Sequence, residues 1–361
     1  MKILIVCPRL CHGGAERVAV SLANGFVSRG HQVQMMSDLY DEITFHVDED
    51  VILSNLVSYN KNKIIKWLSA IANTRNVCKK EKPDVIIGIM ELCSFVSRMA
   101  TVGMDIPVIA TEHDAFERPK SAPMPFILKM TKFYLNRIYT KVTVLTAADK
   151  LAIGRKLNNV VVMPNPLALK PTKELLHKEK IILAAGRVDN WHYKGFDILV
   201  RAWGKIAKKY PEWKLEIAGV YLNAETRPFL DGIAMENGVS DSVVYLGFVD
   251  DMKLLYQKSS IFVLSSRYEG FGLVLIEAMS QGCACVASDY MGRQKEIITN
   301  AREGITCLPE NVNALADSIE QLLVDSNYRH EVQCNAIQRS EYYSIDKTVE
   351  RWENLFNTIL K

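Results

Sequence analysis

The sequence predicts two successive α/β domains, each built on a parallel sheet with helices on both faces. Short apolar runs rich in β-branched residues alternate with stretches of helical periodicity, and this alternation occurs in both halves of the chain. The runs also lack the strict polar alternation of half-exposed strands, which indicates burial on both faces. At 361 residues the chain is long enough for two such domains.

Six strands are expected in each half. In the first half they are residues 2–7, 31–37, 84–90, 107–113, 141–146 and 159–165. In the second half they are residues 181–186, 214–219, 243–247, 260–266, 284–288 and 305–308. Because the segments between them are helical in period, each half should be a doubly wound, Rossmann-like domain.

The domain boundary is expected at Pro164-Asn165-Pro166, since residues before prolines are held in extended conformations. This gives an N-terminal domain of residues 1–165 and a C-terminal domain of residues 166–343. The tail, residues 344–361, should form an amphipathic helix because its apolar residues recur at helical spacing: Val349, Trp352, Leu355, Phe356 and Ile359. The pattern alone does not say on which domain this helix docks.

Composition excludes several classes of protein. With 48% hydrophobic and 24% charged residues the chain is typical of a soluble globular protein. No apolar run approaches the ~18 residues of a spanning helix, and the run before Pro8 is too short for a signal peptide, so we expect a cytoplasmic location. The eight cysteines include no C-x-x-C pair, which favours reduced thiols over a metal site.

Positive charge is concentrated in the first half. Residues 1–165 carry a net charge of +6 and the remainder −3. The stretch 118–156 holds nine basic residues and one acidic residue, and a helix there would separate the apolar residues Met124, Phe126, Ile127, Met130, Phe133, Tyr134 and Ile138 from the cations Lys129, Lys132 and Arg137. This pattern is typical of contact with an anionic membrane surface, and a core helix with a solvated basic face is the alternative. We expect no nucleic-acid partner.

Two motifs of the first half follow predicted strands. Gly13 and Gly14 precede a helix, where backbone N–H groups can approach a phosphate or a sugar, although a tight turn would also explain them. His113 ends the fourth strand within Thr-Glu-His-Asp, so it can face a ligand at the carboxyl end of the sheet, and a structural histidine is the alternative.

Two motifs of the second half also suggest a ligand. Arg187 follows a strand and Lys194 precedes a helix, an arrangement that suits a diphosphate, with two surface cations as the alternative. Glu269 and Glu277 are eight residues apart, about two helical turns, so both carboxylates could face one ligand. Apolar neighbours predict burial of Glu277, against the alternative of a solvated helix face.

Taken in order, the motifs G-G-A-E, T-E-H-D, G-R…K-G, L-G-F-V-D-D and E-x7-E resemble the retaining GT-B glycosyltransferases of family 4 over nearly the whole chain. The likeness is to bacterial enzymes that extend lipid-linked oligosaccharides for surface polysaccharides or glycans. It implies a metal-independent hexosyltransferase without a bound cofactor. The donor would be a nucleotide sugar, UDP-linked in the commonest case. The acceptor would be a saccharide on a polyprenyl diphosphate, used at the inner face of the membrane.

The resemblance also implies roles for individual residues. The expected catalytic set is His113, Arg187, Lys194 and Glu269, in which the two cations bind the donor diphosphate and Glu269 the transferred sugar. The expected donor contacts further include Gly14 and His113 on phosphate and sugar, backbone groups of Phe271 and Gly272, the base pocket of Val249 and Leu273, and Glu277 on the ribose. Six residues separate Arg187 from Lys194, one more than is usual in the family.

Two other functions stay open at this point. A nucleotide-sugar 2-epimerase would need acid and base groups around the sugar ring, for which His113 is the obvious candidate. A catalytically silent scaffold that binds nucleotide sugar and membrane is the other. A Rossmann dehydrogenase is disfavoured because G-x-G-x-x-G is absent.

Overall fold

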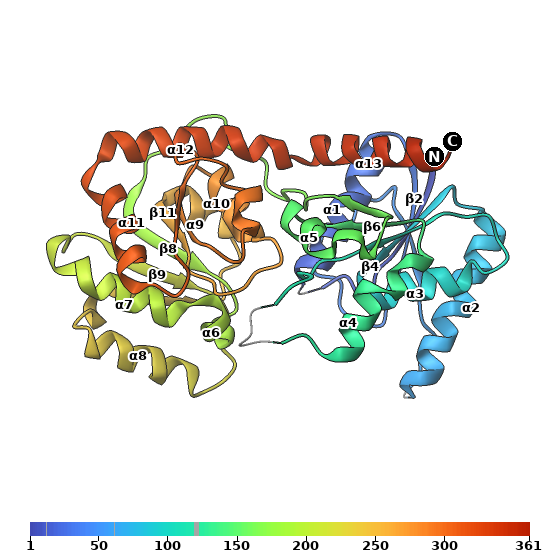
Figure 1. Ribbon diagram of the computed structural model, residues 1–361, viewed down its shortest axis with the longest axis horizontal. Coiled ribbons are helices and arrows are strands. Elements are labelled where there is room, and N and C mark those ends of the chain that lie inside the picture. Colours follow the sequence, from blue (N-terminus) through green and yellow to red (C-terminus); the bar gives the residue numbers. More distant parts are fainter. Residues whose placement is uncertain (12, 61, 119–122) are drawn as a thin grey trace. The chain divides into compact units, whose positions relative to one another are not determined.

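The computed structural model describes the chain except residues 12, 61 and 119–122 (Figure 1). It forms two compact units: unit 1 comprises Met1–Ala168 and Ile345–Lys361, and unit 2 comprises Leu169–Ser344. Each unit contains one parallel sheet with helices on its faces, which confirms the predicted fold class.

The sheet of unit 1 has seven strands in the order β3-β2-β1-β4-β5-β6-β7. They are β1 (Lys2–Val6), β2 (Gln32–Ser37), β3 (Ile52–Asn55), β4 (Val85–Ile89), β5 (Val108–Thr111), β6 (Lys141–Val144) and β7 (Val160–Val162). The expected count of six is wrong here because β3 was not foreseen. This strand is short and lies at the sheet edge, with Ile52 62% exposed, and its apolar run, residues 51–53, is too short to stand out as a buried strand.

The helices of unit 1 begin and end on local signals. They are α1 (Gly14–Ser28), α2 (Lys63–Glu81), α3 (Met90–Ala100), α4 (Phe126–Phe133), α5 (Ala147–Ile153) and α13 (Ile345–Ile359). Asn62 caps α2 by accepting a hydrogen bond from the Ile64 N–H, and Thr146 caps α5 by accepting one from the Asp149 N–H.

Unit 2 repeats the same strand order with six strands, β10-β9-β8-β11-β12-β13. They are β8 (Glu179–Ala185), β9 (Lys214–Ala218), β10 (Val243–Gly247), β11 (Ser259–Leu264), β12 (Ala284–Ser288) and β13 (Ile305–Cys307). The helices are α6 (Trp191–Lys194), α7 (Phe196–Ile206), α8 (Thr226–Glu236), α9 (Met252–Lys258), α10 (Leu273–Ser280), α11 (Val312–Val324) and α12 (Ser326–Ser340). All six strands lie where the sequence predicts them.

The C-terminal helix α13 packs on α1 of unit 1, beside it in Figure 1. The Phe26 ring of α1 lies 6.4 Å from the ring of Trp352 and 5.6 Å from that of Phe356. A Cβ on Gly25 would approach Val349 to 2.8 Å, so this glycine allows the two helices to meet closely. The apolar side of the tail is thereby buried within unit 1.

The basic stretch 118–156 differs from the expected long amphipathic helix. The helix α4 has eight residues and is followed by the 3-10 turn η1 (Leu135–Ile138). Lys132, expected on the basic face, has a fully buried side chain, so that assignment is wrong. The reason is an ion pair with the buried carboxylate of Glu112, twenty positions earlier in the chain.

Apolar side chains of this stretch are instead exposed. They are Phe126, Met130, Tyr134, Leu135 and Ile138, whereas Phe133 is buried. Residues 119–122 and the Ile127 side chain lie outside the described residues. The described part of the helix therefore turns apolar groups outward, together with Lys129.

Candidate functional site

The strand order reverses at the centre of each sheet, between β1 and β4 in unit 1 and between β8 and β11 in unit 2. In open parallel sheets ligands bind at the carboxyl ends of the strands at such a point. In unit 2 the two central strands pair in parallel, so the loops that follow them emerge at one edge. Arg187 lies in the first of these loops and Glu269 in the second.

Lys194 and Glu269 meet at this edge. The Lys194 Nζ lies 2.7 Å from Glu269 Oε1, and the Ser266 hydroxyl donates to the same oxygen at 2.7 Å. The side chains keep 22% and 13% of their surface exposed. One carboxylate oxygen is thus fixed by two donors, while both groups remain open to a ligand.

The turn that presents Lys194 requires a glycine. Gly195 has φ +66°, and a Cβ there would lie 2.0 Å from the Ser265 carbonyl oxygen. The Ser265 hydroxyl donates to the Lys194 carbonyl at 2.9 Å, which ties the end of α6 to the end of β11. Lys194 is the last residue of the short helix α6, and from there its side chain reaches Glu269.

The loop after β8 leaves Arg187 exposed and fixes Asp189. The Asp189 carboxylate accepts hydrogen bonds from the backbone N–H of Leu222 at 2.7 Å and of Asn223 at 3.0 Å. These backbone donors lower the pKa of Asp189. Asp189 therefore joins the loop after β8 to the loop after β9, a role that the sequence analysis did not foresee.

The second acidic residue, Glu277, lies on α10. Its side chain is buried, and the Tyr256 hydroxyl donates to it at 3.3 Å, so the alternative of a solvated helix face is wrong. Glu269 stands in the loop before α10, which begins at Leu273, so the helical arithmetic that placed both carboxylates on one helix face does not apply.

The residues between these two glutamates form the start of α10. Gly272 is its N-cap with φ +102°, and Phe271 is buried with its carbonyl bonded to the Tyr290 hydroxyl at 2.9 Å. The first N–H groups of a helix have no partner within it, so the α10 start can receive an anion. Val249 is half-buried two residues after β10, at the same carboxyl edge of the sheet, and Leu273 is half-buried as well.

In unit 1, the Gly-Gly pair is explained in part by its own helix. A Cβ on Gly13 would lie 1.7 Å from Glu16 Oε2, so the glycine makes room for a buried carboxylate. Arg9 Nε donates to Glu16 Oε1 at 3.2 Å. Gly14 is exposed as the first residue of α1, where its backbone can meet a ligand. His12 lies outside the described residues.

His113 follows β5 and is held as a neutral ring. The Thr111 hydroxyl donates to the Gly88 carbonyl at 3.0 Å, so His113 Nε2, 3.0 Å from that hydroxyl, is the donor of the second bond. Burial lowers the pKa of His113 to about 4. The ring is therefore uncharged at neutral pH, with Nδ1 as a hydrogen-bond acceptor.

Next to His113 lies a buried ion pair that the sequence analysis missed. Lys132 Nζ is 2.9 Å from Glu112 Oε2 and 3.4 Å from Glu91 Oε1. Asn136 donates to the other oxygen of Glu112 at 2.9 Å. Although burial opposes the charged form, these carboxylates raise the pKa of Lys132. The helical periodicity offered no signal for this pair, because it placed Lys132 on the solvated face, away from any buried carboxylate.

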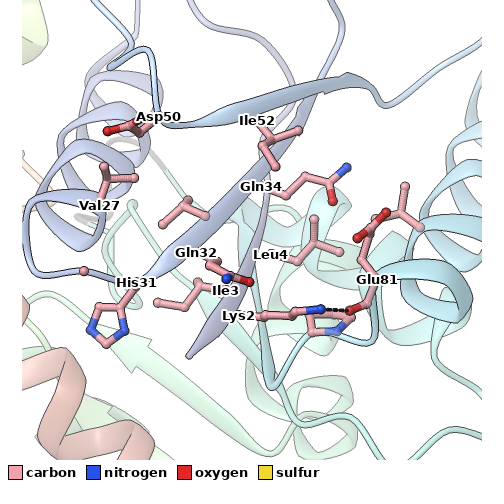
Figure 2. Close-up of a pocket in the computed structure, with 14 residues that line it drawn as sticks. Lys2, Ile3, Leu4, Val27, His31, Gln32, Gln34, Asp50, Ile52 and Glu81 are labelled. Atoms are coloured by element: carbon pink, nitrogen blue, oxygen red, sulfur yellow. Dashed lines mark hydrogen bonds between the residues drawn. The ribbon is translucent and has the colours of Figure 1, made fainter.

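A cavity of about 560 Å³ lies elsewhere in unit 1, at the amino ends of β1 and β2 (Figure 2). Ile3, Leu4 and Ile52 form much of its apolar wall, with Gln32 and Gln34 beside them. The candidate residues Gly14 and His113 follow the opposite ends of the strands. The cavity is therefore separate from the candidate site.

The described residues contain neither a spanning helix nor a metal-binding cluster. No helix among them is long and apolar enough to cross a membrane. No group of three or more histidine, cysteine, aspartate or glutamate side chains in the same part of the chain could hold a metal ion.

The chain matches known families over almost its whole length. Residues 168–339 match the family described as Glycosyl transferases group 1, and residues 12–170 match the family described as Glycosyltransferase Family 4. Over 348 residues it is 29% identical to an uncharacterized glycosyltransferase of Haemophilus influenzae, covering 95% of this chain and 96% of that protein.

Two further comparisons concern a named enzyme and a solved structure. Over 365 residues, 98% of each chain, the sequence is 27% identical to a Campylobacter jejuni protein named GalNAc-alpha-(1->4)-GalNAc-alpha-(1->3)-diNAcBac-PP-undecaprenol alpha-1,4-N-acetyl-D-galactosaminyltransferase. The fold is similar to that of Anabaena Alr3699/HepE, solved in complex with UDP and glucose, with a TM-score of 0.79 and 18% identity over 99% of this chain and 100% of that one.

Proposed function

The chain belongs to glycosyltransferase family 4 and is a retaining glycosyltransferase of the GT-B fold that uses a nucleotide sugar, and we propose that it moves a hexose or an N-acetylhexosamine from a UDP-sugar to a lipid-linked saccharide. The observation that carries this proposal is the contact of Lys194 with Glu269 at the carboxyl edge of the unit 2 sheet. A cation for phosphate and a carboxylate for sugar hydroxyls stand there side by side, with exposed Arg187 in the adjacent loop.

Each side chain has a chemical task in this proposal. Arg187 offers a guanidinium fork to the donor diphosphate, and Lys194 adds a point charge. The N–H groups of Phe271 and Gly272 donate hydrogen bonds to a phosphate oxygen. Glu269 accepts hydrogen bonds from the transferred sugar, and Glu277 from the ribose diol. Val249 and Leu273 line the base, and Gly14 and His113 of unit 1 contact phosphate and sugar.

The proposed reaction forms one bond and breaks one at the anomeric carbon, and it moves one proton. The acceptor hydroxyl oxygen bonds to the anomeric carbon on the face from which UDP departs, while the bond from that carbon to the diphosphate oxygen breaks. The hydroxyl proton passes to the leaving phosphate. Negative charge develops on the diphosphate, and fixed cations and backbone donors stabilise it in the transition state, an effect that commonly contributes most to enzymatic rate enhancement. We propose that these protein groups suffice without a metal ion.

The neutral state of His113 favours transfer over 2-epimerisation. An efficient general acid or base has a pKa near the working pH, whereas burial lowers the pKa of His113 to about 4. Incubation with UDP-N-acetylglucosamine alone separates the functions, because an epimerase would convert this donor without any acceptor.

The acceptor proposal draws on the relative and on the surface of unit 1. The name of the Campylobacter jejuni protein specifies an undecaprenol-linked saccharide as its acceptor. In this chain the helix α4 exposes Phe126 and Met130 beside Lys129. Apolar side chains with neighbouring cations suit shallow contact with an anionic bilayer, at which such an acceptor is held.

The donor and the acceptor can be tested together. UDP release is measured with UDP-N-acetylgalactosamine, UDP-N-acetylglucosamine and UDP-glucose, each with and without a polyprenyl-diphosphate-linked saccharide, and the product anomer is determined by NMR. We expect acceptor-dependent release with one donor and an α-linked product. Release from no donor, together with no thermal shift by UDP, would contradict the proposal.

Substitutions of Glu269 and Glu277 should have different effects in the same assay. Glu269→Ala is expected to reduce turnover and to change the preference among the three donors, since its carboxylate is assigned to the sugar. Glu277→Ala should mainly weaken UDP binding. If neither variant alters turnover or UDP affinity, both residues have only structural roles.

Membrane contact is tested by flotation with phosphatidylcholine vesicles, with and without phosphatidylglycerol. We expect binding that depends on the anionic lipid and falls when Phe126 and Met130 are replaced by serine. The matched control is Leu222→Ser, which removes an exposed apolar side chain of unit 2. Equal flotation of all three proteins, or of none, would remove this part of the proposal.

A further inference from the structure

Unit 2 contains a second ion pair, between Arg267 and Asp197, close in sequence to Glu269 and Lys194. The Arg267 guanidinium donates from Nη1 to Asp197 Oδ1 at 2.8 Å and from Nη2 to Asp197 Oδ2 at 2.9 Å. Both side chains are only 11% exposed. This two-point geometry is the strongest that a guanidinium and a carboxylate can form, and it fixes the orientation of both groups.

Arg267 also binds the backbone of α6. Its Nη1 donates to the His192 carbonyl at 2.6 Å, and its own N–H donates to the Tyr193 carbonyl at 2.8 Å. These two carbonyls immediately precede Lys194 in the chain. Arg267 itself precedes Glu269 by two residues. Arg267 therefore joins the segment that carries Lys194 to the loop that carries Glu269.

Asp197 completes this connection from α7. It lies three residues after Lys194, in the first turn of a helix whose other side chains there, such as Phe196 and Ile198, are apolar and buried. Arg267 is thus held on both sides of Lys194, by the carbonyls of α6 before it and by Asp197 after it. The turn at Gly195 between them has little freedom to move.

We propose that the Arg267–Asp197 pair is a positioning device that sets Lys194 against Glu269 for the donor diphosphate and sugar; this inference rests on the proposed function. Buried ion pairs add little net stability compared with apolar packing, because both charges lose water. This pair connects two loops that follow strands, so it can fix their relative position. Such positioning matters because displacement of a reacting group by about 1 Å can reduce turnover about 100-fold.

The first test separates turnover from affinity. Arg267→Lys keeps the charge and removes the fork, and Asp197→Asn keeps the shape and removes the charge. We expect each to lower kcat for UDP release from UDP-N-acetylgalactosamine by about 100-fold, with the Kd of UDP changed by less than about threefold. Glu320→Gln, which breaks the surface pair with Lys209 in the same unit, is the matched control and should leave kcat unchanged.

The second test asks whether Arg267 acts through Lys194. In a Lys194→Ala background, Arg267→Lys should cost about twofold or less, because the group that it positions is already gone. An equal loss of kcat in both backgrounds would mean general damage to the unit and would overturn the inference. So would a kcat of Arg267→Lys within about twofold of the unaltered protein.

A third measurement needs no substrate. Amide hydrogen exchange of residues 191–195 should be faster in Arg267→Lys and Asp197→Asn than in Glu320→Gln. If the unaltered protein releases UDP from no donor, the proposed function fails, and the exchange rates alone decide whether the pair fixes this turn. Unchanged exchange in both variants would overturn the positioning role, and if Arg267→Lys does not fold, Asp197→Asn decides in its place.

Discussion

Each unit places a lysine against a glutamate near the carboxyl ends of its strands, yet the two pairs differ in access to water. In unit 2, Lys194 and Glu269 are 2.7 Å apart and keep 22% and 13% of their side chains exposed. In unit 1, Lys132 and Glu112 are 2.9 Å apart and expose 0% and 3%. The open pair can exchange a partner for a ligand, whereas the closed pair can only support the residues around it.

The largest effect is expected from breaking the closed pair. Lys132→Met leaves Glu112 buried without its cation, and removal of one member of a buried pair typically costs about 3–5 kcal/mol. Urea unfolding measures this loss, and Lys129→Met on the exposed side of the same helix should change stability by no more than about 0.5 kcal/mol. A loss below about 1 kcal/mol for Lys132→Met would mean that the pair is not closed.

The buried histidine of unit 1, His113, should make the free energy of unfolding depend on pH. Burial lowers the pKa of His113 to about 4 from 6.5, so between these values the unfolded chain binds a proton that the folded chain does not. Stability should therefore fall as the pH drops through this window, by up to about 3 kcal/mol from this residue.

His113→Gln removes that titration. The free energy of unfolding, measured from pH 7 to pH 4 for both proteins, should show a shallower decline in the variant. Because the carboxylates of the unit titrate in both proteins, the difference between the two curves isolates the histidine. Parallel curves would show that the ring is protonated as easily in the folded chain as in water.

Removing a cation from the proposed donor site of unit 2 should raise the activation free energy of turnover by a similar amount. Arg187→Ala removes a donor to the developing charge on the diphosphate, and loss of one such group typically costs about 100-fold in kcat, or about 2.7 kcal/mol. Lys208→Ala, an exposed cation elsewhere in the unit, is the control. A near-normal rate of UDP release by Arg187→Ala would remove this residue from the proposed site.

The smallest effect concerns the N-terminal cap of α11 in unit 2. Asn311 caps α11 by accepting a hydrogen bond from the Ala314 N–H at 2.9 Å, so Asn311→Ala should cost about 1 kcal/mol. Thermal unfolding gives the loss, and the kcat of UDP release should not change. A fall in kcat would show that the open pair depends on the stability of the whole unit rather than on its own contacts.

The strands could be predicted from the sequence because apolar runs report burial directly. The edge strand β3 could not, since its apolar run, residues 51–53, is short and most of the strand is only half-buried. The same limit explains Lys132: periodicity assigned it to a solvated face, but its environment is set by Glu112, twenty positions earlier in the chain. Local pattern carries no information on such a partner.

For the candidate site, the sequence identified residues but not their connections. The loops after β8 and β11 could be expected to meet once the strand order was known. Asp189 and Arg267 escaped notice because their partners, Leu222 and Asp197, are 33 and 70 positions away. Only the fold brings these groups together.

The division of the chain also bears on how the protein is made. Unit 1 is assembled from both ends of the sequence, and unit 2 is encoded entirely between them. On the ribosome, unit 2 therefore has all of its residues before unit 1 does, because α13 follows unit 2 in the chain. Until then Phe26 lacks its partners Trp352 and Phe356, so the half that is synthesised first is the half that finishes last.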